Sequence, residues 1–141
     1  MSTKPKVYVS ARAKTRLKEV REIQNHLRET GYDVTSDWTD ASIARPYRDT
    51  KNRLRNLTAQ ERMLRSAADV DIFILIDDEG LRGAYVELGA FLYDCLGSSR
   101  GRQAYIVGKD SHKREHIFES PDYVKYCDTI DDVYQDLKIA A

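Results

Sequence analysis

The fold of this chain is decided by the stretch Asp71-Ile72-Phe73-Ile74-Leu75-Ile76, which is followed closely by Gly80-Leu81-Arg82-Gly83-Ala84-Tyr85-Val86-Glu87-Leu88-Gly89. The first part is apolar at every position after Asp71, as is typical of a central parallel strand that is buried on both faces. The second part contains a glycine-bearing loop and the start of a helix. In an α/β domain such a loop lies at the carboxyl edge of the sheet, where ligands bind. Glu87, just past the loop, is therefore a candidate functional residue.

Helix and strand patterns alternate on both sides of this stretch. Apolar residues at helical spacing from Leu17 to Leu27 predict one helix, and Thr58 with Glu61 has the pattern of a capping box that opens another. The polar segment between them, residues 36–56, predicts a long loop of functional interest. The predicted strands are Lys6 to Ser10, Tyr32 to Thr35, Asp71 to Ile76, Gln103 to Val107 and Tyr123 to Tyr126; the predicted helices are Lys14 to Thr30, the one opened by Thr58, Ala84 to Leu96, and Asp131 to Ile139.

This alternation predicts one α/β domain over residues 1–141. The sheet is expected to be parallel, with helices on both faces. Five strands suggest a flavodoxin-like strand order of 2-1-3-4-5. That order places a switch point, and a crevice for ligands, between the first and third strands. The loops that follow Ser10 and Ile76 should then flank one pocket.

The composition excludes several classes of partner. Lys plus Arg and Asp plus Glu both number 23, so the formal net charge is zero, and neither a nucleic acid polymer nor an anionic membrane is expected as a partner. No apolar run approaches the roughly 20 residues of a membrane-spanning helix. Cys95 and Cys127 form no CxxC pair and no signal peptide is evident, which favours a cytoplasmic location. His112 and His116 lack the further ligands of a closed zinc site, so neither a metal nor a cofactor is expected.

Glu87 lies at the border of the apolar stripe on its predicted helix. Ala84, Leu88 and Phe91 belong to that stripe, which places Glu87 close to the sheet and near the amino end of the helix. The helix dipole there favours the ionised carboxylate, and an ionised carboxylate beside an apolar wall is suited to attack an electrophilic carbon. The alternative is a glutamate selected only for the dipole. Gly89 weakly favours the first interpretation, because glycine inside a helix costs about 1 kcal/mol relative to alanine and suggests a close approach.

Other polar residues surround the predicted pocket. Asp77 and Asp78 follow the central strand at its carboxyl end, where they either contact a ligand or form a solvated loop. Tyr8, in the first strand, is either a core residue or a donor that holds a carboxylate. Asp71 either opens the central strand as a polar terminus or contributes to catalysis.

Two further loops could contact a ligand. Ser10 and Arg12 follow the first strand at a helix amino end, which can receive a phosphate, although without a glycine-rich turn the favoured explanation is a basic, solvated helix start. Trp38, on the long loop, could stack on a planar ring or pack the loop against the body of the domain.

These residues together resemble the nucleoside 2-deoxyribosyltransferase family. The resemblance rests on Val7-Tyr8-Val9-Ser10, on Ala68-Asp69-Val70-Asp71-Ile72-Phe73, and on Gly83-Ala84-Tyr85-Val86-Glu87-Leu88-Gly89-Ala90, in the right order along the first hundred residues. The Glu-Leu-Gly pattern after a loop of small residues is the most specific of the three. The chain departs from the family in the basic loop after Ser10 and at its carboxyl terminus.

The resemblance implies an enzyme in which a glutamate attacks C1′ of a 2′-deoxyribosyl group, displaces the nucleobase and forms a covalent intermediate that another base or water resolves. Glu87 matches the nucleophile, Asp71 the acid that protonates the leaving base, and Tyr8 the residue that orients the nucleophile, so all three are expected to converge on one cleft. The resemblance adds further ligand contacts, namely Gly83 in the glycine-bearing loop, Asp77 or Asp78, and, from a neighbouring chain of a homo-oligomer, Asp122.

Three functions remain open from the sequence. The first is transfer of a deoxyribosyl group between nucleobases, with a deoxynucleoside and a free base as ligands. The second, implied by similarity to the deoxynucleoside 5′-monophosphate N-glycosidases, is hydrolysis of a deoxynucleotide by the same glutamate. The third is a non-catalytic nucleotide-binding module. Two carboxylates suffice for the first two reactions without a metal, since glycoside cleavage needs an anion beneath the anomeric carbon and a proton for the leaving group.

Overall fold

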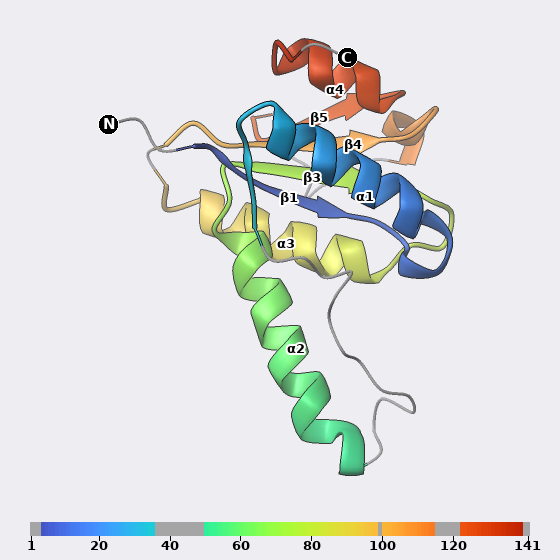
Figure 1. Cartoon of the computed structure of the whole chain (residues 1–141), viewed down its shortest axis with the longest axis vertical. Coiled ribbons are helices and arrows are strands. Elements are labelled where there is room, and N and C mark those ends of the chain that lie inside the picture. The colour runs from blue at the N-terminus through green and yellow to red at the C-terminus, as the bar shows by residue number, and fades with distance from the viewer. Residues whose placement is uncertain (1–3, 36–49, 99, 115–121, 140–141) are drawn as a thin grey trace.

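A computed structural model describes residues 4–35, 50–98, 100–114 and 122–139 of the chain. Five parallel strands form one sheet in the order β2-β1-β3-β4-β5, which confirms the predicted flavodoxin-like topology (Figure 1). The strands are β1 (Lys6–Ser10), β2 (Asp33–Val34), β3 (Ile72–Ile76), β4 (Gln103–Val107) and β5 (Val124–Cys127). All five residues of β3 are buried, because β1 and β4 pair with it on either side and helices cover both of its faces.

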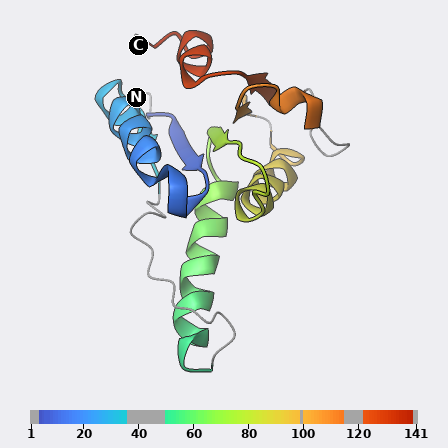
Figure 2. The same ribbon diagram turned by 90° about the vertical axis from the view of Figure 1, so that its right-hand side faces the viewer.

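Two separate apolar clusters lie on the two faces of the sheet. On one face, Val7 and Val9 of β1 and Ile72, Ile74 and Ile76 of β3 pack against α1 (Ala13–Glu29) and α4 (Ile130–Asp136). On the other face, Tyr8, Phe73 and Leu75 pack against α3 (Gly83–Cys95) and the last turn of α2 (Thr50–Ala68). The view along the sheet shows these helices on opposite sides of it (Figure 2). The alternation of side chains along each strand therefore decides which residues face α3.

The register of the sheet aligns the strand ends that bear the predicted site. Ser10 of β1 pairs with Leu75 of β3, and Ile76 of β3 pairs with Val107 of β4. The loops after β1 and β3 consequently leave the sheet side by side, at its carboxyl edge. This edge is the one that the strand order of a doubly wound sheet offers to a ligand.

The helix before β3 differs most from its prediction. It begins at Thr50 rather than at Thr58, so Thr58 lies within the helix, where its hydroxyl donates to the carbonyl of Leu54 at 2.9 Å. The part of the predicted loop from Thr50 to Asn56 is helical, and the rest of it lies outside the described residues. The first turns of α2 show no amphipathic stripe because Leu54 and Leu57 are exposed rather than packed on the sheet.

A capping box does occur, at the start of α4. The Thr129 hydroxyl accepts from the backbone N–H of Asp132, and the Asp132 carboxylate accepts from the backbone N–H of Thr129. This reciprocal pair satisfies two backbone donors at the helix start. The helix ends at Asp136, three residues before the predicted end, and β2 is limited to Asp33–Val34.

The long helix α2 leaves the body of the domain at an angle, with only its last turns against the sheet (Figure 1). Its carboxyl end packs beside α3. No helix in the described ranges is long and apolar enough to cross a membrane.

Candidate functional site

Glu87 lies in the second turn of α3, on the side that faces β1. The buried residues of this helix are Ala84, Leu88, Phe91 and Cys95, and Glu87 is half-buried at the border of the stripe that they form. This placement agrees with the position that its helical spacing predicts. It brings a carboxylate over the carboxyl end of the first strand.

Two hydroxyl groups of β1 hold the Glu87 carboxylate. The Tyr8 hydroxyl donates to Oε2, and the Ser10 hydroxyl donates to Oε1 at 2.8 Å. Tyr8 and Ser10 are two residues apart, so their side chains leave the strand on the same face. Both residues are buried, and the Tyr8 ring stacks on Phe73 with centroids 5.6 Å apart. Each carboxylate oxygen is therefore fixed by one donor from a rigid strand.

Burial raises the pKa of Glu87 above its ordinary value, and the hydrogen bonds from Tyr8 and Ser10 partly oppose that rise. Among the residues that the structure describes, no Lys or Arg forms an ion pair with it. Within the described residues the carboxylate is thus ordered by neutral donors and by no cation. Such a group is a stronger nucleophile toward a carbon that carries positive charge than one neutralised by an ion pair.

Asp77 lies at the carboxyl end of β3, on the same side of the sheet as α3. It is buried, and its Oδ1 accepts from the Tyr85 hydroxyl at 2.8 Å and from the backbone N–H of Asp78 at 3.0 Å. Tyr85 and Glu87 both belong to the start of α3. The same helix therefore orders carboxylates at the ends of two neighbouring strands, β1 and β3.

The loops after β1 and β3 are joined by two arginines. Arg12 Nη2 donates to the carbonyl of Glu79 at 2.7 Å and lies 3.2 Å from the place that a Cβ on Gly80 would occupy. Gly80 has φ +76°, a left-handed conformation that favours glycine. Arg16 contacts both Asp78, at 3.3 Å, and Glu19, at 2.9 Å, and these carboxylates raise the pKa of its guanidinium. Arg12 and Arg16 are thus each engaged by other groups of the protein.

The prediction that Asp71 joins Tyr8 and Glu87 in one cleft is wrong. Asp71 precedes β3, so it lies at the amino edge of the sheet, roughly 13 Å of strand away from Leu75 and its partner Ser10. Its carboxylate accepts from the backbone N–H of Lys6 at 2.9 Å and pairs with Arg100 at 3.5 Å. Asp71 therefore links the amino ends of β1 and β3, and it cannot reach a group bound at Glu87.

The other predicted ligand contacts have mixed outcomes. Gly83 is the exposed first residue of α3, and Gly89 is also exposed; a Cβ on either would meet no described atom within 4 Å, so no close approach explains Gly89. Asp122 is exposed and precedes β5, at the amino edge of the sheet. Its contribution to the pocket of a neighbouring chain stays a prediction. Trp38 lies outside the described residues.

The sequence interpretation gave one residue of the site a different role and missed another. Ser10 was expected to contact a phosphate, whereas it holds Glu87; the two-residue spacing from Tyr8 was the available signal. Tyr85 was not singled out, although it is the residue that donates to Asp77. Within the described residues, no three His, Cys, Asp or Glu side chains are grouped so that they could share a metal ion. Comparison with known proteins finds neither a family model nor a curated protein that matches the chain.

Proposed function

We propose that this chain is an enzyme that acts on the N-glycosidic bond of 2′-deoxynucleosides and exchanges their nucleobase. The observation that carries the proposal is the Glu87 carboxylate, which is held by the Tyr8 and Ser10 hydroxyls and by no described cation. It lies at the carboxyl edge of a doubly wound sheet, the usual ligand position in this architecture. The resemblance to the nucleoside 2-deoxyribosyltransferases rests on the same glutamate.

In the proposed reaction a Glu87 oxygen attacks C1′ of the deoxyribosyl group. The C1′–N bond breaks, its electron pair leaves with the nucleobase, and an ester joins C1′ to the carboxylate. A second nucleobase then attacks C1′ and releases Glu87. The two hydroxyl groups contribute by holding the carboxylate in one orientation before attack, so that less freedom is lost on the way to the transition state.

The departing nucleobase needs a proton, and Asp71 is too far away to give it. Asp77 is our candidate for this role, because it is buried at the neighbouring strand end and ordered by Tyr85. Asp77 would supply the second carboxyl group that glycoside-cleaving enzymes use to protonate the leaving group. Asp77→Asn should slow the reaction most for bases that leave poorly.

The engaged arginines favour a substrate without a phosphate. A 5′-phosphate bears close to two negative charges and would have to compete with the carboxylates of Asp78 and Glu19 for Arg16, and with the backbone carbonyl of Glu79 for Arg12. This observation supports deoxynucleoside transfer over hydrolysis of a deoxynucleotide. A non-catalytic module is less consistent with the site, since Glu87 makes no ion pair with a described residue that would account for its burial.

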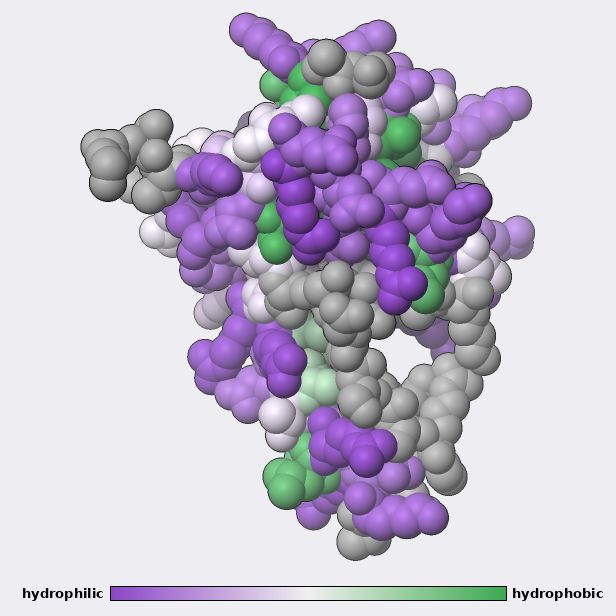
Figure 3. Space-filling view, in the orientation of Figure 1, coloured by the Kyte–Doolittle hydropathy of each residue, from purple (hydrophilic) through white to green (hydrophobic). Residues whose placement is uncertain are grey.

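A homo-oligomer is part of the proposal. Several large apolar side chains are exposed on α2 and α3, namely Leu54, Leu57, Val86, Tyr93 and Leu96, while most of the face seen in Figure 3 is hydrophilic. A second chain would bury them and could bring Asp122 to the pocket. Light scattering of the protein and of Tyr93→Glu tests this: the variant should shift toward the monomer, and a monomeric parent protein would contradict it.

One incubation series tests the catalytic proposal. The protein is mixed with a deoxynucleoside or a deoxynucleotide, each with and without a free acceptor base, and products are followed by chromatography. Exchange only when the acceptor is present supports transfer, and base release without an acceptor indicates hydrolysis. Mass spectrometry after a short incubation should find a deoxyribosyl group on the peptide that carries Glu87. No turnover of any of these substrates would reject the proposal.

A further inference from the structure

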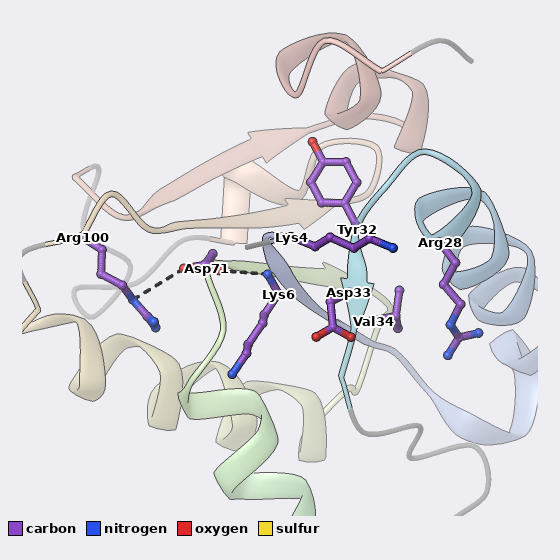
Figure 4. A pocket seen from close by; sticks show the side chains of 8 residues that line it. All are labelled: Lys4, Lys6, Arg28, Tyr32, Asp33, Val34, Asp71 and Arg100. Carbon is purple, nitrogen blue, oxygen red and sulfur yellow. Dashed lines mark hydrogen bonds and ion pairs between the residues drawn. The ribbon is translucent and has the colours of Figure 1, made fainter. Parts of the chain in front are cut away.

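A cavity lies at the amino edge of the sheet, at the opposite ends of the strands from Glu87. Its volume is about 780 Å³, within the range of small-molecule sites. Figure 4 shows it open between β1, β2 and the residues before β3 and β4. The lining residues are Lys4, Lys6, Arg28, Tyr32, Asp33, Val34, Asp71 and Arg100.

The charges on the β3 side of this cavity are compensated within the protein. Arg100 pairs with Asp71 at 3.5 Å and with Asp69 at 3.3 Å, and the Lys6 ammonium lies 3.9 Å from Asp69. The second oxygen of Asp71 accepts from the Lys6 backbone. These groups form a closed network that needs no ligand.

The charges on the β2 side are different. In the described part of the chain, neither Lys4 nor Arg28 has a carboxylate within ion-pair distance, and the side-chain contact of Arg28 is a long hydrogen bond of 3.5 Å to Asn25. Figure 4 shows both side chains beside β2. Arg28 lies in the last turn of α1, where the helix dipole already favours a cation. The dipole does not account for Lys4, which precedes β1.

We propose that this cavity binds a small hydroxylated phosphate ester of the sugar-phosphate class. The phosphate would carry about two negative charges at pH 7 and would neutralise Lys4 and Arg28 together. Asp33, whose carboxylate lies between the two cationic sides of the cavity (Figure 4), would accept a hydrogen bond from a sugar hydroxyl. The half-buried ring of Tyr32 forms an apolar wall. This inference does not depend on the proposed catalytic function.

The test is a titration of backbone amide signals of the full chain by NMR, with ribose 5-phosphate, inorganic phosphate and ribose as probes. Because the cations are exposed and screened by solvent, we expect a dissociation constant of about 1 mM for ribose 5-phosphate. The shifted amides should be those of residues 4, 6, 28 and 32–34. Lys4→Gln and Arg28→Gln should each weaken binding about five-fold.

Lys18→Gln is the matched control, since Lys18 is an exposed cation on the same helix as Arg28 and lies outside the cavity. It should leave binding unchanged. Asp33→Asn should tighten inorganic phosphate and reduce the preference for ribose 5-phosphate over it. The proposal is overturned if ribose binds as well as ribose 5-phosphate, or if Lys18→Gln weakens binding as much as Arg28→Gln does. It is also overturned if the shifted signals cluster around Glu87, or if the titration does not saturate by about 20 mM, well above the expected dissociation constant.

Discussion

The two ends of β1 and β3 hold carboxylates in opposite ways. At the carboxyl edge, Glu87 is half-buried and held by two neutral hydroxyls. At the amino edge, Asp71 is held by Arg100 and a backbone N–H. Asp71 forms an ion pair with Arg100, whereas Glu87 meets no cation among the described residues and is ordered by neutral donors. The partners of a carboxylate group therefore decide whether it is available for chemistry. Its position at a strand end matters less.

The largest expected effect that this comparison predicts is on the rate of base release. Glu87→Ala should lower the rate by about 10³-fold or more, as the loss of a nucleophile does in other covalent enzymes, because the covalent route is removed. The free energy of unfolding should change by about 1 kcal/mol or less, since Glu87 borders the core without filling it. Chromatography of the released base and a denaturant titration measure the two quantities. Undiminished turnover would show that Glu87 is not the nucleophile.

A smaller effect is expected when one of the two neutral donors is removed. Tyr8→Phe keeps the stacked ring and deletes the hydroxyl, so the rate should fall about 10- to 100-fold, at or below the usual size of a proton-transfer or positioning contribution. The Tyr8 hydrogen bond lowers the pKa of Glu87, and its loss should raise that pKa further. The acid limb of the rate profile should then move to higher pH.

The control for this variant is Tyr93→Phe, which removes an exposed hydroxyl on the same helix as Glu87. It should leave the acid limb in place. A Tyr8→Phe enzyme with an unshifted limb would show that the hydroxyl does not act on the charge of Glu87.

The burial of the Glu87 carboxyl group should also be visible in the free energy of unfolding. Because burial raises the folded-state pKa of Glu87, the protein is most stable, with respect to this group, below the unfolded pKa of about 4.3 and loses that contribution as pH rises through the folded value. Glu87→Gln should therefore be more stable than the parent at pH 7, by about 1 kcal/mol, the usual size of a single-substitution effect. Denaturant titrations at pH 7 and at pH 4 check the sign: the difference should shrink at the lower pH.

The smallest effect is expected at the amino edge. Asp71→Asn removes an ion pair with a partly exposed arginine, which contributes about 1 kcal/mol or less, and the rate of base release should not change. Thermal unfolding and the base-release assay measure both. A large loss of activity would show that Asp71 acts in catalysis and that the contrast between the two edges is misplaced.

Much of the fold could be predicted because its signals are local. The doubly apolar run of β3 and the helical spacing in α1 and α3 indicate the layers directly. The start of α2 could not be predicted in this way, because its first turns project from the body and expose Leu54 and Leu57. A helix that buries little there leaves no periodic pattern in the sequence.

The candidate site was predicted in part for a similar reason. Glu87 was found from its helical spacing, and Tyr8 was assigned as its partner from the resemblance. Asp71 was placed wrongly, although chain direction alone puts a residue that precedes a parallel strand at the amino edge; the resemblance outweighed that argument. The contact between Tyr85 and Asp77 depends on the rotation of α3 relative to β3, which periodicity does not fix.

The contact between Arg12 and Gly80 constrains how this chain can vary in evolution. Any side chain at position 80 would need a left-handed backbone conformation and would also press on the Arg12 guanidinium. A shorter residue at position 12 would relieve the second restriction and lose the bond to Glu79. Positions 12 and 80, 68 residues apart, should therefore change together among related chains, and a glycine should persist wherever the arginine does.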